Sequence, residues 1–169
     1  MDGDGLCLTT DVDIFLSHMN NARYVRELDF ARSFFYDRCG IFREIKKNGG
    51  KLVQGATAIR YRRPMPVFAL YKITTELIYW DDKNIYTQHE FVKLSDKFVH
   101  ATVLSKQSIV GSAIHVPDII EQIEPGAIRF ELSEELSLWM KSLSESSLKF
   151  KRLREEELNV DTTAFLQDP

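Results

Sequence analysis

Cysteine is scarce in this sequence, and long apolar runs are missing. The 169 residues include only two cysteines, Cys7 and Cys39, too few for a disulfide framework. No charged segment followed by an apolar one marks a secretory signal, so we interpret both as thiols in a reducing compartment and expect a cytoplasmic location. Charges interrupt every apolar run well before the roughly 18 residues that a membrane span needs. We therefore expect a soluble chain without a membrane span.

Acidic and basic residues are also nearly balanced. The formal net charge is only -3, whereas nucleic-acid-binding domains usually present a basic face. We expect no nucleic-acid partner. The hydrophobic content of 44% over 169 residues suits a single globular domain with a core large enough to be stable by itself.

Several catalytic signatures are absent as well. The glycines before Lys51 lack the spacing of a phosphate-binding Walker loop, and neither a dinucleotide-binding G-x-G-x-x-G nor a G-x-S-x-G nucleophile elbow occurs. The histidines are His18, His89, His100 and His115. Their spacing shows none of the pairing typical of zinc sites. We therefore expect neither a metal nor a cofactor.

The strongest signal that is present lies between residues 11 and 40, where a polar segment is followed by a helical pattern. Apolar side chains recur there at helical spacing, at Tyr24, Leu28, Ala31 and Phe35. Asn20 or Asn21 suits the N-cap of this helix, and Gly40 suits its left-handed end. The polar segment before the helix, which we call the elbow (residues 11–20), is preceded by a short strand expected at 6–10.

Strand periodicity begins at residue 51. We expect strands at 52–61, 70–80, 85–94 and 98–109, of which the last three are joined by short connections and form an antiparallel meander. One long apolar helix and about five strands predict an α+β fold in which the sheet curls around the helix. Residues 1–5 are expected to be disordered, 6–147 to form one domain, and 148–169 to form a charged tail. Within that domain we expect short helices at 41–47 and 117–123, and a helix at 133–147, capped by Ser133, that packs on the surface.

The elbow contains groups suited to acid–base chemistry. Asp13 can act as a general base on water or as a nucleophile, and His18 can orient the water or a carbonyl. Backbone N–H groups at Asn21 to Arg23 can polarise a carbonyl oxygen, with help from the helix dipole. Thioester hydrolysis needs no more than this. The alternative interpretation is that Asp13 and His18 only hydrogen-bond the elbow backbone.

Two further groups have both a functional and a structural interpretation. Asn20 and Asn21 are good capping residues, so a role in binding substrate is secondary to that one. The second group is the set Arg60, Arg62 and Arg63, interleaved with Tyr61 at a strand end. These arginines can hold the phosphates of a nucleotide-like carrier, or they can simply form a solvated strand end.

The string D-x-D followed by HMNNARY, at residues 11–13 and 18–24, resembles the hotdog-fold acyl thioesterases, and within them the group around thioesterase superfamily member 6. The likeness covers residues 7–111. It implies a long helix wrapped by an antiparallel sheet, a homodimer with one continuous sheet, and active sites at the subunit interface. It also implies an acyl-CoA or another acyl thioester as substrate.

By this resemblance Asp13 corresponds to the catalytic carboxylate of the 4-hydroxybenzoyl-CoA thioesterase type. His18 and Asn21 join it as catalytic residues. The elbow is about one residue longer than the bacterial D-x-D-x-x-G-H-V-N-N form and lacks its glycine, so Asp11 competes with Asp13. The expected substrate-binding residues are Asn20, Arg23, Tyr24, Arg60, Arg62 and Arg63.

Two other functions remain open at this point. A hotdog enoyl-CoA hydratase also has an Asp and a His five residues apart, although its intervening Asn-Pro is replaced here by other residues. A non-catalytic acyl-binding or scaffold protein would keep the fold without turnover. Relatives of this group carry a hydrophobic leader and are associated with the endoplasmic reticulum or secretory membranes. The ten residues before Asp11 suggest a shortened product whose location differs.

Overall fold

The computed structural model describes residues 2–15 and 17–165, with side chains described for 3–15 and 17–155. These residues form two compact units that divide after Phe130. The first unit contains the sheet and the elbow, and the second is a single helix.

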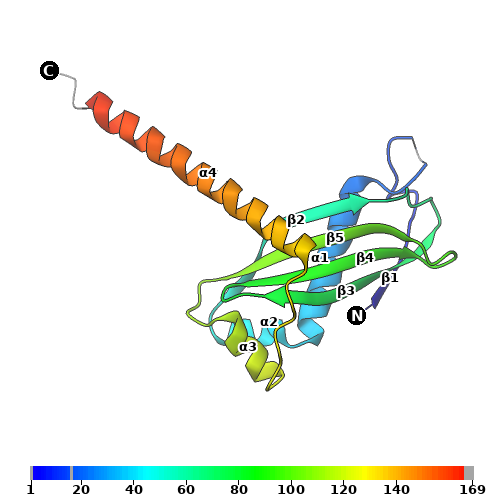
Figure 1. The fold of residues 1–169 in the computed structure, drawn as a ribbon. Coiled ribbons are helices and arrows are strands. Elements are labelled where there is room, and N and C mark those ends of the chain that lie inside the picture. The colour runs from blue at the N-terminus through cyan, green and yellow to red at the C-terminus, as the bar shows by residue number, and fades with distance from the viewer. Residues whose placement is uncertain (1, 16, 166–169) are drawn as a thin grey trace. The chain divides into compact units, whose positions relative to one another are not determined.

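The first unit is built on a five-stranded antiparallel sheet with the strand order β1-β3-β4-β5-β2 (Figure 1). Its strands are β1 (Asp2–Leu6), β2 (Lys51–Tyr61), β3 (Leu70–Trp80), β4 (Asn84–Lys93) and β5 (Val99–Val110). The meander expected for β3, β4 and β5 is confirmed by their pairing. Besides the long helix α1, the unit contains the short helices α2 (Ile41–Lys47) and α3 (Val116–Ile123).

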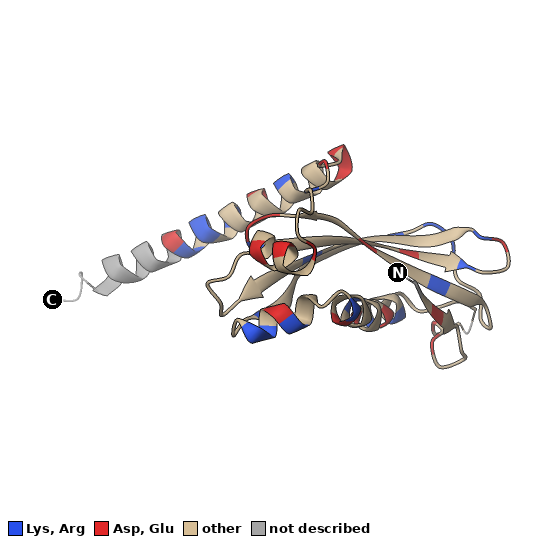
Figure 2. Cartoon of the chain, turned by 90° about the horizontal axis from the view of Figure 1, so that it is seen from below, with Lys and Arg blue, Asp and Glu red and all other residues tan. Residues whose placement is uncertain are grey.

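The long helix α1 (Asn21–Arg38) lies across one face of the sheet, on the same side as α2 (Figure 2). The Asn20 side chain accepts a hydrogen bond from the Ala22 N–H at 2.8 Å, which confirms the capping prediction. Gly40, just beyond the helix, has a φ of 80°, a conformation that favours glycine. The helix therefore begins and ends where its sequence predicts, and its first turn lies beside the elbow.

The core between α1 and the sheet has apolar clusters at both ends of the helix and a polar band between them. Tyr24 and Leu28 belong to the cluster nearer the elbow, and Phe35 to the other. The buried polar band consists of Arg32, Thr75, Thr87, His89 and Ser105. His89 lies 3.0 Å from each of the two threonine hydroxyls, and Arg32 donates to Ser105 at 3.3 Å. These contacts satisfy polar groups that would be costly to bury alone.

The N-terminal strand differs from its prediction. It spans Asp2–Leu6 and pairs with Leu70–Thr74 of β3, whereas Thr9 and Thr10 form a turn. The expected disorder of residues 1–5 is therefore wrong for residues 2–5, and Met1 lies outside the described residues. Strand pairing stabilises this polar, glycine-containing segment through backbone hydrogen bonds, which composition does not indicate.

The second unit contains α4 (Glu134–Phe165). Ser133 caps this helix as predicted, because its hydroxyl accepts from the Leu136 N–H at 3.3 Å. The boundary expected at 147/148 falls inside the helix, since the charged residues continue the helical backbone without a break. Residues 166–169 of the expected tail lie outside the described residues. In the described chain, no helix has the combined length and apolarity of a membrane span.

Candidate active site

The elbow is a small hairpin that precedes α1. The Asp13 N–H donates to the His18 carbonyl at 2.9 Å, and Val12 pairs with Met19. Met19 also donates from its backbone N–H to the Met65 carbonyl at 2.8 Å. These bonds fix the hairpin to the segment that follows β2, so Asp13 and His18 are held beside each other.

The Asp13 carboxylate is a hydrogen-bond acceptor for its own hairpin. Its Oδ1 accepts from the Ser17 N–H at 3.0 Å and from the His18 N–H at 3.4 Å, while Oδ2 lies 3.6 Å from His18 Nδ1. The Ser17 amide is the largest of the influences that lower the pKa of Asp13 below its ordinary value. The carboxylate is therefore ionised at neutral pH. These contacts are the ones expected if Asp13 only hydrogen-bonds the elbow backbone. They also keep its carboxylate negatively charged, as a general base must be.

The competing carboxylate, Asp11, is buried. Its Oδ2 accepts from the Leu8 N–H at 2.8 Å, and its Oδ1 lies 3.1 Å from Arg23 Nε. Arg23 also pairs with Glu27 at 3.0 Å. Asp11 and Arg23 thus form part of a charged chain that ties the elbow to α1. This arrangement directs the Arg23 guanidinium to protein carboxylates.

The first amides of α1 are partly engaged. The Ala22 N–H donates to the Asn20 side chain, and the Arg23 N–H donates to the Asn20 carbonyl at 2.9 Å. Of the three amides expected to polarise a carbonyl, only that of Asn21 has no hydrogen-bond acceptor among the residues that the structure describes. The Asn21 carbonyl accepts from the Tyr61 hydroxyl at 3.2 Å, which joins the helix start to the end of β2.

A pocket of about 160 Å³ opens at this junction. It is lined by His18, Met19, Asn21, Tyr24, Tyr61, Arg62, Arg63 and Pro64. Among these, the Tyr24 ring packs on the Tyr61 ring at 5.1 Å between centroids. Burial raises the Tyr24 pKa to about 12, so this phenol stays protonated. We call this recess the elbow pocket.

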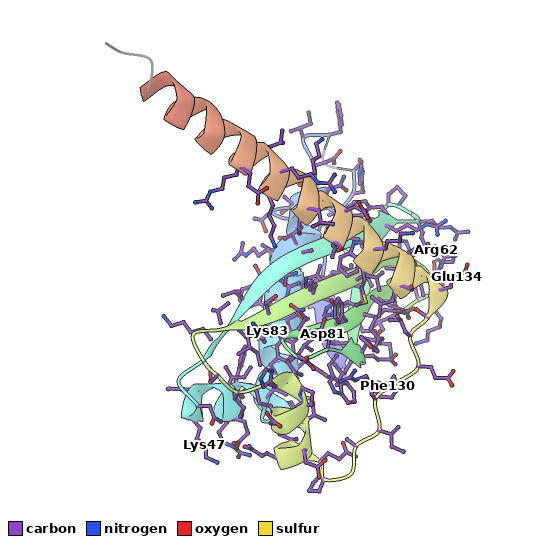
Figure 3. All side chains as sticks on the ribbon, turned by 60° about the vertical axis from the view of Figure 1, so that its left-hand side comes forward. Lys47, Arg62, Asp81, Lys83, Phe130 and Glu134 are labelled. Carbon is purple, nitrogen blue, oxygen red and sulfur yellow. The ribbon has the colours of Figure 1, made fainter. Side chains whose placement is uncertain are left out.

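The two arginines of the elbow pocket rest on an aromatic side chain. Arg62, labelled in Figure 3, and Arg63 place their guanidinium carbons 5.0 Å and 3.8 Å from the centroid of the Phe98 ring. Buried His100 fixes the backbone beneath them, because its Nδ1 lies 3.2 Å from the Arg63 carbonyl and 3.0 Å from the Pro64 carbonyl. Such stacking restricts a guanidinium and leaves its N–H groups for an anionic ligand.

The structure thus brings together part of the predicted site. His18, Asn21, Tyr24, Arg62 and Arg63 meet at the elbow pocket, and Asp13 lies next to it through His18. The other predicted residues, Asn20, Arg23 and Arg60, are not in its lining. The sequence interpretation missed His100, because no local pattern indicates which of four scattered histidines approaches the strand end.

A second cavity, of about 400 Å³, lies between β1, β3 and α1. Its walls include Glu27, Ala31, Phe34, Phe35 and Thr75. It adjoins the charged chain of Asp11 through Glu27. Among the described residues, no group of three or more His, Cys, Asp or Glu side chains is arranged to hold a metal ion.

The chain is similar in sequence and in fold to known proteins. The family model described as "Thioesterase-like superfamily" matches residues 7–140. A Drosophila melanogaster protein named "Protein THEM6" is 49% identical over 148 residues, which cover 88% of this chain and 76% of that relative. The Xenopus laevis protein of the same name is 37% identical, with 87% and 70% covered.

Solved structures share the fold at low sequence identity. The YbaW probable thioesterase from Escherichia coli has a TM-score of 0.64 at 21% identity, with 74% of this chain and 96% of that chain covered. The BH1999 gentisyl-coenzyme A thioesterase has a TM-score of 0.61 at 17% identity, with 73% and 98% covered. The α+β prediction is confirmed, and the fold is the hotdog fold. The chain belongs to the thioesterase-like superfamily.

Proposed function

We propose that this protein hydrolyses an acyl thioester, with acyl-CoA as the carrier form. The observation that carries this proposal is the elbow pocket, which is lined both by His18, held beside ionised Asp13, and by two arginines stacked on one ring. An ionised carboxylate and two arginines thus lie near one helix start, in a chain of the thioesterase-like superfamily, and this supports the proposal.

Asp13 is the base in this proposal. Its carboxylate takes a proton from water while the water oxygen attacks the thioester carbonyl carbon. The carbon–sulfur bond of the tetrahedral intermediate then breaks, and the proton passes to the departing thiolate. The products are a carboxylic acid and a free thiol. His18, 3.6 Å from Asp13, orients the attacking water.

The helix start supplies the oxyanion site. The Asn21 N–H is the remaining amide at the positive end of α1, and negative charge that develops on the carbonyl oxygen is stabilised there. The Asn20 cap holds this turn in place. The Arg62 and Arg63 guanidiniums receive the phosphates of the carrier. A related precedent for such a ligand is the SAV2348 protein from Staphylococcus aureus, solved in complex with CoA, which shares the fold at 14% identity and a TM-score of 0.60.

The proposal includes a homodimer. In the described chain β2 pairs only with β5, so its other edge is open, and most of its side chains are exposed. An open strand edge of this kind favours pairing with another strand, and closed two-fold pairing is the commonest solution. A second copy pairing at β2 would continue the sheet. Light scattering at micromolar concentration tests this, since a monomeric mass contradicts it.

A non-catalytic acyl-binding protein is the second candidate. The observation in its favour is that Asp13 accepts hydrogen bonds from its own hairpin, and two of three helix amides are engaged. Binding without turnover needs no free base.

Release of free thiol from acyl-CoAs of increasing chain length separates the candidates. Hydrolysis above the rate without protein supports the enzyme and ranks its substrates. Saturable binding of a non-hydrolysable acyl-CoA analogue without thiol release supports the binding protein and overturns the hydrolase.

A further inference from the structure

A large apolar cavity lies at the end of α1 away from the elbow. It measures about 770 Å³, and its lining includes Phe35, Trp80, Ile120 and Phe130. These side chains come from α1, β3, α3 and the segment that follows α3, where Phe130 is labelled in Figure 3. The volume falls within the roughly 300–1,000 Å³ typical of small-molecule sites. We call it the distal cavity.

The distal cavity is separate from the elbow pocket. Asn21 lines the elbow pocket, and Phe35 lines the distal cavity. Fourteen residues of helix α1 separate them, a rise of roughly 20 Å. The two recesses have no lining residue in common. A ligand in the distal cavity therefore does not occupy the proposed catalytic groups.

The charged groups of the two recesses are opposite in sign. The elbow pocket has Arg62 and Arg63. The charged residues that line the distal cavity are Glu76 and Glu124, both exposed at its rim, and no lysine, arginine or histidine among the described residues belongs to its lining. An anionic head group would meet two carboxylates there. The neighbouring Arg129 is not in the lining, and its guanidinium carbon lies over the Tyr79 ring, 5.7 Å from the ring centroid.

We propose that the distal cavity binds one long alkyl chain with a cationic amine head group. The apolar walls bury the chain, which is the main source of affinity. Glu76 and Glu124 pair with the ammonium group at the rim. The same carboxylates discriminate against a fatty acid anion of equal length. This site is independent of the proposed thioesterase activity.

The chain contains its own reporter of occupancy. Cys39 lines the distal cavity and is partly buried, whereas the other cysteine, Cys7, is 0% exposed. Alkylation of the native protein by N-ethylmaleimide, followed by mass spectrometry, therefore measures access to Cys39 against an internal control. The ligands are dodecylamine, dodecanol and dodecanoate, each below the concentration at which it forms micelles.

We expect dodecylamine to slow alkylation of Cys39 at lower concentration than dodecanol, and dodecanoate to protect least. Replacing both carboxylates, as Glu76→Gln with Glu124→Gln, should weaken protection by dodecylamine by about two- to fivefold for each pair lost and leave dodecanol unchanged. Asp37→Asn is the matched control, because Asp37 is an exposed carboxylate of α1 outside the lining. This control should not change the dodecylamine concentration required.

Three outcomes overturn the proposal. Protection by dodecanoate equal to that by dodecylamine contradicts the assigned head group, and so does an amine preference that survives the double substitution. Absence of protection by all three ligands contradicts the site itself. None of these results depends on thioester hydrolysis. The proposal for the distal cavity and the thioesterase proposal can therefore be refuted independently of each other.

Discussion

The buried polar band predicts a specific dependence of stability on pH. His89 is 0% exposed, and burial, with a smaller contribution from the Arg32 charge, lowers its pKa to about 3. In the unfolded chain the pKa returns to about 6.5. Between these values the unfolded state binds one more proton than the folded state. The free energy of unfolding therefore falls as the pH falls through this window. Above about pH 6.5 His89 is neutral in both states and adds no pH dependence.

The magnitude follows from these two values. One proton gives a slope of about 1.4 kcal/mol per pH unit, so the contribution of His89 to the loss between pH 6.5 and pH 4.5 is roughly 2 kcal/mol. His89→Gln removes the titrating group and keeps a neutral side chain that can hydrogen-bond a threonine hydroxyl. We expect this variant to have a free energy of unfolding about 1–3 kcal/mol lower at pH 7, because its contacts with the threonines are disturbed. Its free energy of unfolding should also change less with pH.

Urea unfolding of both proteins at several pH values measures this slope. His115→Gln is the control, because His115 is exposed at the start of α3. The steep part of the slope, which comes from the burial of His89, should persist in this control. An equally steep slope in His89→Gln and wild type would refute the assignment of a neutral, buried His89.

Three more predictions concern the elbow and the elbow pocket. Asn20→Ala should lower the free energy of unfolding by about 1 kcal/mol, measured in urea, because α1 loses its cap; an unchanged value would contradict that role. Asp11→Ala should cost about 1–3 kcal/mol in the same assay, because the Leu8 N–H loses its acceptor and Arg23 keeps only Glu27 as a partner; an unchanged free energy of unfolding would argue against a structural role. Arg63→Ala should raise KM for acyl-CoA about fivefold with little change in kcat, whereas Arg60→Ala, outside the pocket lining, should not; equal effects would place the carrier elsewhere.

Much of the fold was predictable because its signals are local. The strand at Leu70–Trp80, the Asn20 cap and the turn at Gly40 all follow from periodicity or from single residues with restricted roles. The position of β1 was not predictable, because its stability comes from pairing with β3, and that partner lies more than sixty residues along the chain. Arg32 likewise occupies a buried position of α1 that a helical pattern of apolar residues does not reveal.

The candidate site shows the same limit. The sequence indicates that Asp13, His18 and Asn21 lie near a helix start, since they are close in the chain. It does not indicate that Arg23 turns to Asp11 and Glu27, or that His100 holds the backbone of Arg63. Both arrangements depend on contacts between segments distant in sequence. Long-range packing therefore decides which of the predicted polar residues reach the pocket.

The most direct test of the thioesterase proposal is the rate of acyl-CoA hydrolysis by Asp13→Asn. The matched control is Asp96→Asn, because Asp96 also accepts a backbone amide, that of Phe98 at 3.1 Å, and also has a lowered pKa. Loss of the base predicts a fall in kcat of about 100-fold or more for Asp13→Asn, with folding retained in circular dichroism, and wild-type rates for Asp96→Asn. An equal rate in Asp13→Asn and wild type would remove Asp13 from the mechanism and contradict the account.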